Sequence, residues 1–151
     1  MTRYLPRRRA LALAWALAFV ACGHSPESHF ARGDEYFENE QYAQAANEYK
    51  AGLSLEPGSA LAWNRLGMTY RLMYNESRTS NWKKLELDAF QRAVAADSTY
   101  WPALVNLGAT LYYLGQKAEG SAYIRRSLLV HPENPDRAAL EALLADSIAA
   151  D

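Results

Sequence analysis

The stretch WNRLGMTY, residues 63–70, decides the fold of this chain because its pattern recurs at regular intervals along the sequence. It consists of a tryptophan, a leucine–glycine pair and a tyrosine, with two other residues between successive landmarks. An earlier copy of the pattern has Gly33 in the place of Gly67, and Tyr36 follows Gly33 at the distance at which Tyr70 follows Gly67. The interval between Gly33 and Gly67 has a length that is typical of proteins built from stacked structural repeats.

A third copy of the pattern lies further along the chain, at a longer interval. The next leucine–glycine pair with matching neighbours ends at Gly108, and the interval from Gly67 to Gly108 exceeds that from Gly33 to Gly67 by seven positions. Three pairs of landmarks have one and the same spacing: Gly33 with Gly108, Gly52 with Ser127, and Pro57 with Pro132. The sequence therefore contains three repeats, and the middle one has seven additional residues.

In these residues the chain resembles the tetratricopeptide repeat (TPR) proteins, whose repeat is a pair of antiparallel helices that pack through contacts between large and small side chains. The resemblance covers residues 26–134 and divides them into TPR repeats 26–59, 60–100 and 101–134. It implies an all-α fold, a right-handed α-solenoid of three TPR helical hairpins.

Each predicted repeat keeps a small residue that faces the next helix and a large residue that fills the hairpin from the second helix. The small residues are Gly33, Gly67 and Gly108, and the large ones are Tyr49, Phe90 and Ile124. The chain departs from the family pattern at Glu86 and Gly120, where the second helix usually has alanine. We expect these departures to weaken single packing contacts without removing the repeat.

The seven additional residues of the middle repeat come from the polar stretch YNESRTSNWKK, residues 74–84. This composition favours an extended turn between the two helices. Because seven residues are about two helical turns, lengthening both helices by one turn each is the alternative. Trp82, which stands beside several cations, either seals the interior of the hairpin or forms a candidate contact site in the insertion.

Residues 135–151 follow the third repeat and are predicted to form a last helix, with leucines on one face and acidic residues on the other. A stack of repeats leaves an apolar surface exposed at its end, and a terminal helix of this kind covers it. We interpret the segment as a capping helix. A helix that binds a partner is the alternative interpretation.

Residues 1–21 have the features of a secretory signal peptide, because four arginines precede an uncharged apolar run. The run is shorter than the roughly 20 apolar residues of a membrane-spanning helix. It ends in Phe19-Val20-Ala21-Cys22, which resembles the lipobox of bacterial lipoproteins. That resemblance implies cleavage before Cys22, lipidation of its thiol, and a short lipid-anchor tether over residues 22–25. Cleavage after Ala18 without lipidation is the alternative.

Charge and motifs argue against several classes of function. Once the four arginines of the first nine residues are set aside, 12 of the 16 Lys and Arg stand against all 17 Asp and Glu, so no nucleic-acid surface is expected. The histidines and the single cysteine have no partners at metal-ligand spacing, so we expect no metal and no cofactor. The sequence lacks the motifs of nucleophilic hydrolases, phosphate-binding loops and zinc proteases, and we do not expect an enzyme.

In TPR proteins, ligands usually contact fixed positions on the first helix of each repeat, which line the concave face. Carried over to this chain, the resemblance implies a partner-binding groove made of Phe30, Asp34, Asn64, Met68, Arg71, Val105, Ala109, Tyr112 and Tyr113. Phe30 and Asp34 occupy the first positions of the lysine clamp with which some family members grip a carboxylate. We therefore expect the ligand to be an apolar or amphipathic segment of a protein or peptide.

Together these features predict a membrane-tethered TPR adaptor or scaffold that mediates protein–protein interaction in the bacterial cell envelope. Gly23, in place of aspartate after Cys22, favours the periplasmic face of the outer membrane in a Gram-negative cell. The chain resembles small lipoproteins that serve as pilotins or envelope assembly factors. A regulatory subunit of a cell-wall enzyme complex and a secreted, unlipidated TPR protein are the alternatives.

Overall fold

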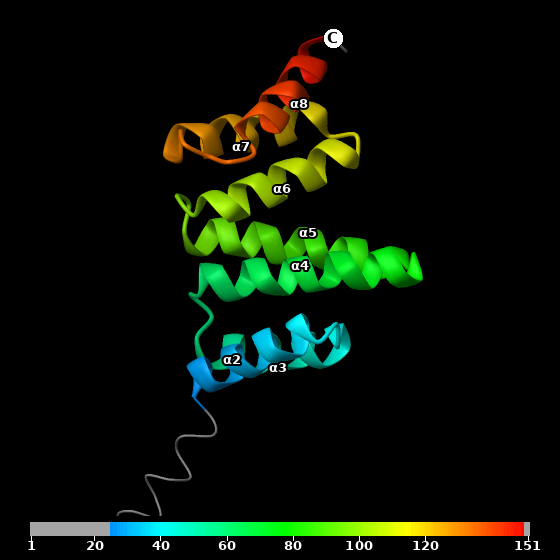
Figure 1. Cartoon of the computed structure of the whole chain (residues 1–151), viewed down its shortest axis with the longest axis vertical. Coiled ribbons are helices and arrows are strands. Elements are labelled where there is room, and N and C mark those ends of the chain that lie inside the picture. Colours follow the sequence, from blue (N-terminus) through cyan, green and yellow to red (C-terminus); the bar gives the residue numbers. More distant parts are fainter. Residues whose placement is uncertain (1–24, 150–151) are drawn as a thin grey trace, which may run out of the picture.

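The computed structural model describes residues 25–149, and the predicted all-α fold is confirmed over this range. The helices are α2 (Pro26–Glu38), α3 (Tyr42–Leu55), α4 (Ala60–Ser77), α5 (Ser80–Ala96), α6 (Trp101–Tyr113), α7 (Lys117–Val130) and α8 (Arg137–Ala149). They form an elongated stack in chain order (Figure 1). The predicted signal peptide and the predicted lipidation site Cys22 lie outside the described residues.

The helices pair as hairpins, and each hairpin packs on the next one along the chain. The pairs are α2 with α3, α4 with α5, and α6 with α7, so the predicted repeats 26–59, 60–100 and 101–134 each hold one pair. Contacts between hairpins join α3 to α4 and α5 to α6, and α4 also contacts α6. The result is a solenoid in which every repeat is supported mainly by its neighbours.

Local signals explain where the first helices of repeats 1 and 2 begin. The hydroxyl of Ser25 accepts a hydrogen bond from the amide of Ser28 at 3.2 Å, and the hydroxyl of Ser59 accepts one from the amide of Ala62 at 3.3 Å. These bonds satisfy backbone donors that a helix start leaves without an internal partner. Gly115, after the end of α6, has a φ of 87°, a left-handed conformation that glycine adopts without steric cost.

The predicted contacts between small and large residues are confirmed inside each hairpin. A methyl group added at Gly33 would lie 2.6 Å from the ring of Tyr49, and one at Gly67 would lie 2.5 Å from the ring of Phe90. At Gly108 it would lie 2.8 Å from Ile124 Cγ1 and equally close to the carbonyl oxygen of Gly120. The glycines thus let a large side chain, or in the third repeat also a backbone, approach the first helix closely.

The additional residues of the middle repeat lengthen its helices, so the extended turn is wrong and the alternative is correct. Helices α4 and α5 have 18 and 17 residues, whereas the corresponding helices of the first repeat have 13 and 14. Only Arg78 and Thr79 remain between them. The polar stretch is helical up to Ser77, whose hydroxyl donates to the carbonyl of Met73 at 2.8 Å, and Arg78, with a φ of 56°, ends the helix.

The last helix, α8, packs on α7 at the end of the stack. Its Leu140 is buried, and its Asp146 accepts hydrogen bonds from the hydroxyl of Tyr112 and from Lys117 Nζ. These contacts agree with the interpretation of α8 as a cap on the third repeat. Across residues 25–149, none of the helices combines the length and the hydrophobicity that crossing a membrane requires.

Candidate functional site

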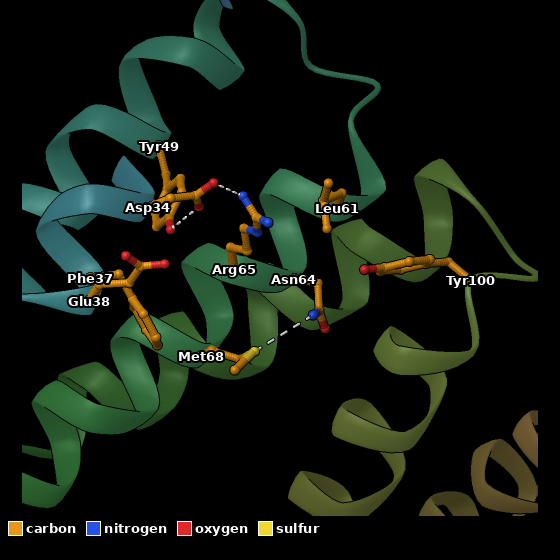
Figure 2. A pocket seen from close by; sticks show the side chains of 9 residues that line it. All are labelled: Asp34, Phe37, Glu38, Tyr49, Leu61, Asn64, Arg65, Met68 and Tyr100. Atoms are coloured by element: carbon orange, nitrogen blue, oxygen red, sulfur yellow. Dashed lines mark hydrogen bonds and ion pairs between the residues drawn. The ribbon is translucent and has the colours of Figure 1, made fainter. Parts of the chain in front are cut away.

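A cavity of about 400 Å³ opens between the first helices of repeats 1 and 2 (Figure 2). Helices α2 and α4 supply most of its lining, and the residue before α6 closes one side. The lining residues are Asp34, Phe37, Glu38, Tyr49, Leu61, Asn64, Arg65, Met68 and Tyr100. Repeats 1 and 2 therefore share one hollow on the face that the sequence predicts as the binding groove.

Asp34 anchors the polar wall of this cavity. Its Oδ1 accepts a hydrogen bond from the hydroxyl of Tyr49 at 2.7 Å, and its Oδ2 forms an ion pair with Arg65 (Figure 2). Burial of Tyr49, together with its hydrogen bond to the carboxylate, raises the pKa of that hydroxyl well above its usual range. Tyr49 is therefore a fixed donor, and the ion pair joins α2 to α4 across the repeat boundary.

The opposite wall is apolar and partly open to solvent. Leu61 is 47% exposed and Met68 is 36% exposed, although both line the cavity. Phe37 and Tyr100 are half-buried beside them. Large aliphatic and aromatic side chains left open in a concave surface are the usual means by which a site binds an apolar ligand group.

A polar network continues from this cavity toward the third repeat. Asn64, at the cavity floor, accepts a hydrogen bond from Asn106 Nδ2 at 3.0 Å, and Asn106 Oδ1 accepts one from Arg71 at 2.9 Å. Arg71 also forms an ion pair with the fully buried carboxylate of Glu86, with 2.9 Å between Nε and Oε1. The groove floor between α4 and α6 is thus made of fixed polar groups.

Glu86 receives a second cation and a hydroxyl. Lys83 Nζ lies 2.8 Å from Glu86 Oε2, and the hydroxyl of Thr110 donates to Oε1 at 2.9 Å. A buried carboxylate is costly unless such partners surround it. The family position that usually holds alanine is therefore occupied here by the centre of an ion-pair network.

A second cavity, of about 250 Å³, lies over this network between α4, α5 and α6. Its lining consists of Arg71, Asn75, Lys83, Glu86, Ala109, Thr110 and Tyr113. Tyr113 is 77% exposed and forms the outer edge. The groove therefore has two hollows, one on each side of α4.

The structure divides the nine residues that were predicted to line the groove. Asp34, Asn64 and Met68 line the first cavity, whereas Arg71, Ala109 and Tyr113 line the second. Val105 is half-buried on α6.

Phe30 and Tyr112 are directed into the fold. The ring of Phe30 packs on Gly52 inside the first hairpin, and Tyr112 is buried with its hydroxyl on Asp146 of α8. Trp82 is half-buried and stacks on Tyr70 with ring centroids 5.9 Å apart. That position explains Trp82 as part of the hairpin interior, and a contact role for it stays a prediction.

Several lining residues were not among those that the sequence assigned to the groove. Arg65 and Tyr100 belong to the first cavity, and Lys83 and Glu86 belong to the second. A signal for Arg65 exists in the sequence, because an arginine on α4 can complement the carboxylate of Asp34 one repeat earlier. Within residues 25–149, no three His, Cys, Asp or Glu side chains are grouped so that they could hold a metal ion.

Comparison with known sequences points to the repeat family. Residues 33–73 match the family described as TPR repeat. The chain is 28% identical over 96 residues to the peroxisomal targeting signal receptor of Candida albicans, and 24% identical over 106 residues to that of Kluyveromyces lactis. These matches cover 64% and 70% of this chain but only 15% and 18% of the receptors, so this chain spans less than a fifth of their length.

Solved structures with the same fold cover most of the chain. The first TPR domain of Spaghetti (RPAP3), bound to an HSP90 peptide, superposes with a TM-score of 0.70 at 19% identity, over 83% of this chain and 91% of that one. The type III secretion chaperone SycD of Yersinia enterocolitica, in complex with a peptide of the translocator YopD, gives 0.70 at 12% identity, over 82% and 92%. The described part of this chain has the fold of a tetratricopeptide repeat solenoid.

Proposed function

We propose that this protein is an adaptor that holds a segment of another protein in the groove between the first helices of its repeats. The observation that carries the proposal is the cavity of about 400 Å³, in which Leu61 and Met68 are left open beside fixed polar groups. A peptide that covers these side chains gains apolar burial. Two proteins of the same fold, RPAP3 and SycD, were solved with peptides bound, which supports this use of the fold.

The groove favours an apolar or amphipathic segment over a lone carboxylate. Each cation near it already contacts a protein carboxylate, because Arg65 is held by Asp34 while Arg71 and Lys83 share the single carboxylate of Glu86. An incoming carboxylate would therefore have to share its cation with a protein carboxylate, so a ligand also needs apolar contacts to bind here.

A charge introduced at Leu61 tests the proposal. The variant Leu61→Asp places a carboxylate in the apolar wall, and we expect at least about a tenfold loss of partner capture from detergent-solubilised native membranes. The matched control is Leu129→Asp, because Leu129 is 81% exposed on α7, outside the residues that line the two cavities. Equal capture by both variants, with unchanged helical circular dichroism, would show that the groove does not bind the partner.

The adaptor is further proposed to be a lipoprotein of the bacterial cell envelope, on the basis of the lipobox-like residues 19–22. Cys22 precedes Ser25, the cap of α2, by three residues, which span at most roughly 10 Å when extended. A lipid on Cys22 would thus hold the first repeat close to a bilayer, at the outer membrane's periplasmic face in a Gram-negative cell. A pilotin-like or assembly role there requires a partner that is itself in the envelope.

Metabolic labelling tests the lipid anchor separately from the groove. An alkyne fatty acid should label the wild-type chain and leave Cys22→Ala unlabelled. Labelling of both chains, or of neither, would contradict lipidation at Cys22 and favour the secreted alternative. Leu61→Asp should be labelled like the wild type, which keeps the two proposals independent.

A further inference from the structure

The two cavities of the groove carry opposite net charge. The first is lined by two carboxylates, Asp34 and Glu38, and by one guanidinium, Arg65. The second is lined by two cations, Arg71 and Lys83, and by one carboxylate, Glu86. Every other residue of both linings is uncharged, so the net charges are −1 and +1.

The excess charge in each cavity is accessible to a ligand. In the first, Asp34 and Arg65 neutralise each other, whereas Glu38 is exposed and forms no ion pair with another described residue. In the second, Arg71 and Lys83 share the single carboxylate of Glu86 and are 32% and 26% exposed. One carboxylate at one end and one cation at the other thus remain uncompensated.

Helix α4 sets a minimum distance between the two cavities. It contributes residues 61–68 to the first cavity and residues 71–75 to the second. At 1.5 Å per residue, the midpoints of these two segments are about 13 Å apart along the helix axis. An extended peptide advances about 3.3 Å per residue, so it covers this distance with four or more residues.

We propose that the groove selects and orients an extended segment of a partner protein that has a basic side chain at one end, an acidic side chain at the other, and apolar residues between them. The basic side chain lies at Glu38, the apolar residues lie against Leu61 and Met68, and the acidic side chain lies at the Arg71–Lys83 end. Complementary charges at the two ends exclude the reversed orientation, because reversal sets like charges against each other. This inference rests on the proposed function of the groove as a peptide site.

The test uses blocked fluorescent peptides of one composition and different charge order. KKGLYLGEE and EEGLYLGKK are bipolar in the two chain directions, and EKGLYLGEK mixes the charges at both ends. We expect one of the bipolar peptides to bind at least about fivefold tighter than the mixed one at low salt, by fluorescence anisotropy. The difference should fall to about twofold or less in about 0.5 M NaCl, because these charges face solvent.

A charge reversal assigns the basic end of the peptide to the first cavity. Glu38→Lys should weaken the preferred bipolar peptide at least about fivefold, and the doubly acidic peptide EEGLYLGEE should then bind this variant better than it binds the wild type. Glu133→Lys makes the same change at an exposed position in the turn before α8 and should leave all affinities within about twofold. Circular dichroism checks that both variants keep their helices.

A second variant tests whether the acidic end of the peptide lies in the second cavity. Lys83→Gln leaves Glu86 paired with Arg71 and reduces the net charge of the second cavity to zero. The ratio of the affinities of the bipolar and the mixed peptide should then fall by about half or more.

The outcomes separate this inference from the proposed function. Equal binding of bipolar and mixed peptides, still abolished by Leu61→Asp, overturns the charge selection and leaves the groove as a peptide site. A bipolar preference that survives Glu38→Lys also overturns it. If none of the peptides binds, the inference fails, while capture of the native partner still tests the proposed function.

Discussion

Repeats 2 and 3 differ in how they fill the space between their two helices at the same position of the repeat. Glu86 on α5 and Gly120 on α7 occupy equivalent places in their repeats, and both are buried against the first helix of their own hairpin. In repeat 2 the carboxylate of Glu86 extends to Arg71, Lys83 and Thr110. In repeat 3 the absence of a side chain at Gly120 brings its carbonyl oxygen close to Gly108.

The repeat pattern therefore does not determine which groups fill the interior of each hairpin. The hairpin of repeat 2 is filled by a phenylalanine ring on Gly67 and by an ion-pair network, so side chains set the separation of its helices. At Gly120 the hairpin of repeat 3 has backbone against backbone, so the nearest atoms include no side chain that could move to accept a larger residue. Substitutions at matched positions should therefore have unequal costs.

The largest effect is expected for Gly120→Ala. The added methyl group would lie 2.5 Å from the carbonyl oxygen of Gly108 and 2.8 Å from the amide nitrogen of Tyr112, and neither can move without moving α6. We expect a loss of about 3 kcal/mol in the free energy of unfolding, measured by urea denaturation, even though alanine favours the helix. Gly58→Ala is the matched control, because nothing lies within 4 Å of the added group. A loss below about 1 kcal/mol would show that the two helices can separate at no great cost.

A smaller effect is expected for Glu86→Ala in repeat 2. Alanine is the usual family residue here, but the change leaves two cations and the Thr110 hydroxyl without their shared partner. Because Arg71 and Lys83 keep partial access to water, we expect a loss of about 2 kcal/mol instead of the larger cost of a fully buried unpaired charge. Asp88→Ala, which removes the exposed pair with Arg92, should change stability by about 0.5 kcal/mol or less. A gain in stability for Glu86→Ala would mean that the network serves recognition and not folding.

The smallest effect is expected for Gly67→Ala. The new methyl group would lie 2.5 Å from the ring of Phe90, which can shift its side chain where a backbone cannot. Part of the packing cost is offset by the better helix propensity of alanine, so we expect a net loss of about 1 kcal/mol. Thermal denaturation of Gly67→Ala and Gly120→Ala under the same conditions gives the ranking. Equal losses would remove the distinction between the ring contact and the backbone contact.

The sequence predicted the architecture because repeats place their landmarks at regular intervals. Gly67 and Phe90 could be paired without a structure, since the same two positions recur in the other repeats. The length of α4 could not be predicted in this way. The composition of the polar residues after Tyr74 is typical of a turn. In the structure the hydroxyl of Ser77 donates to the helix backbone, and only two residues separate α4 from α5.

The groove was predicted less completely than the fold. Family positions selected Asp34 and Met68, which line the first cavity because the first helix of each repeat presents a constant face. They also selected Phe30 and Tyr112, whose rings turn inward because Gly52 and α8 offer them space and a partner. Glu86 could not be predicted as part of the site, because its partners Arg71 and Thr110 lie 15 and 24 residues away along the sequence.

The network around Arg71 has a further consequence for how the molecule opens. Arg71 lies on α4, where Glu86 of α5 holds it, and it donates hydrogen bonds to Asn106 and Thr110 of α6, so repeats 2 and 3 cannot part without breaking its bonds to α6 together. Repeats 1 and 2 are joined differently, by the ion pair of Asp34 with Arg65 and by an apolar core cluster that includes Leu53, Leu66 and Tyr70. In a linear stack, local opening separates neighbouring repeats. The amide hydrogens around Asn106 and Thr110 should therefore become exchangeable together, because one opening event breaks all the bonds of Arg71 to α6.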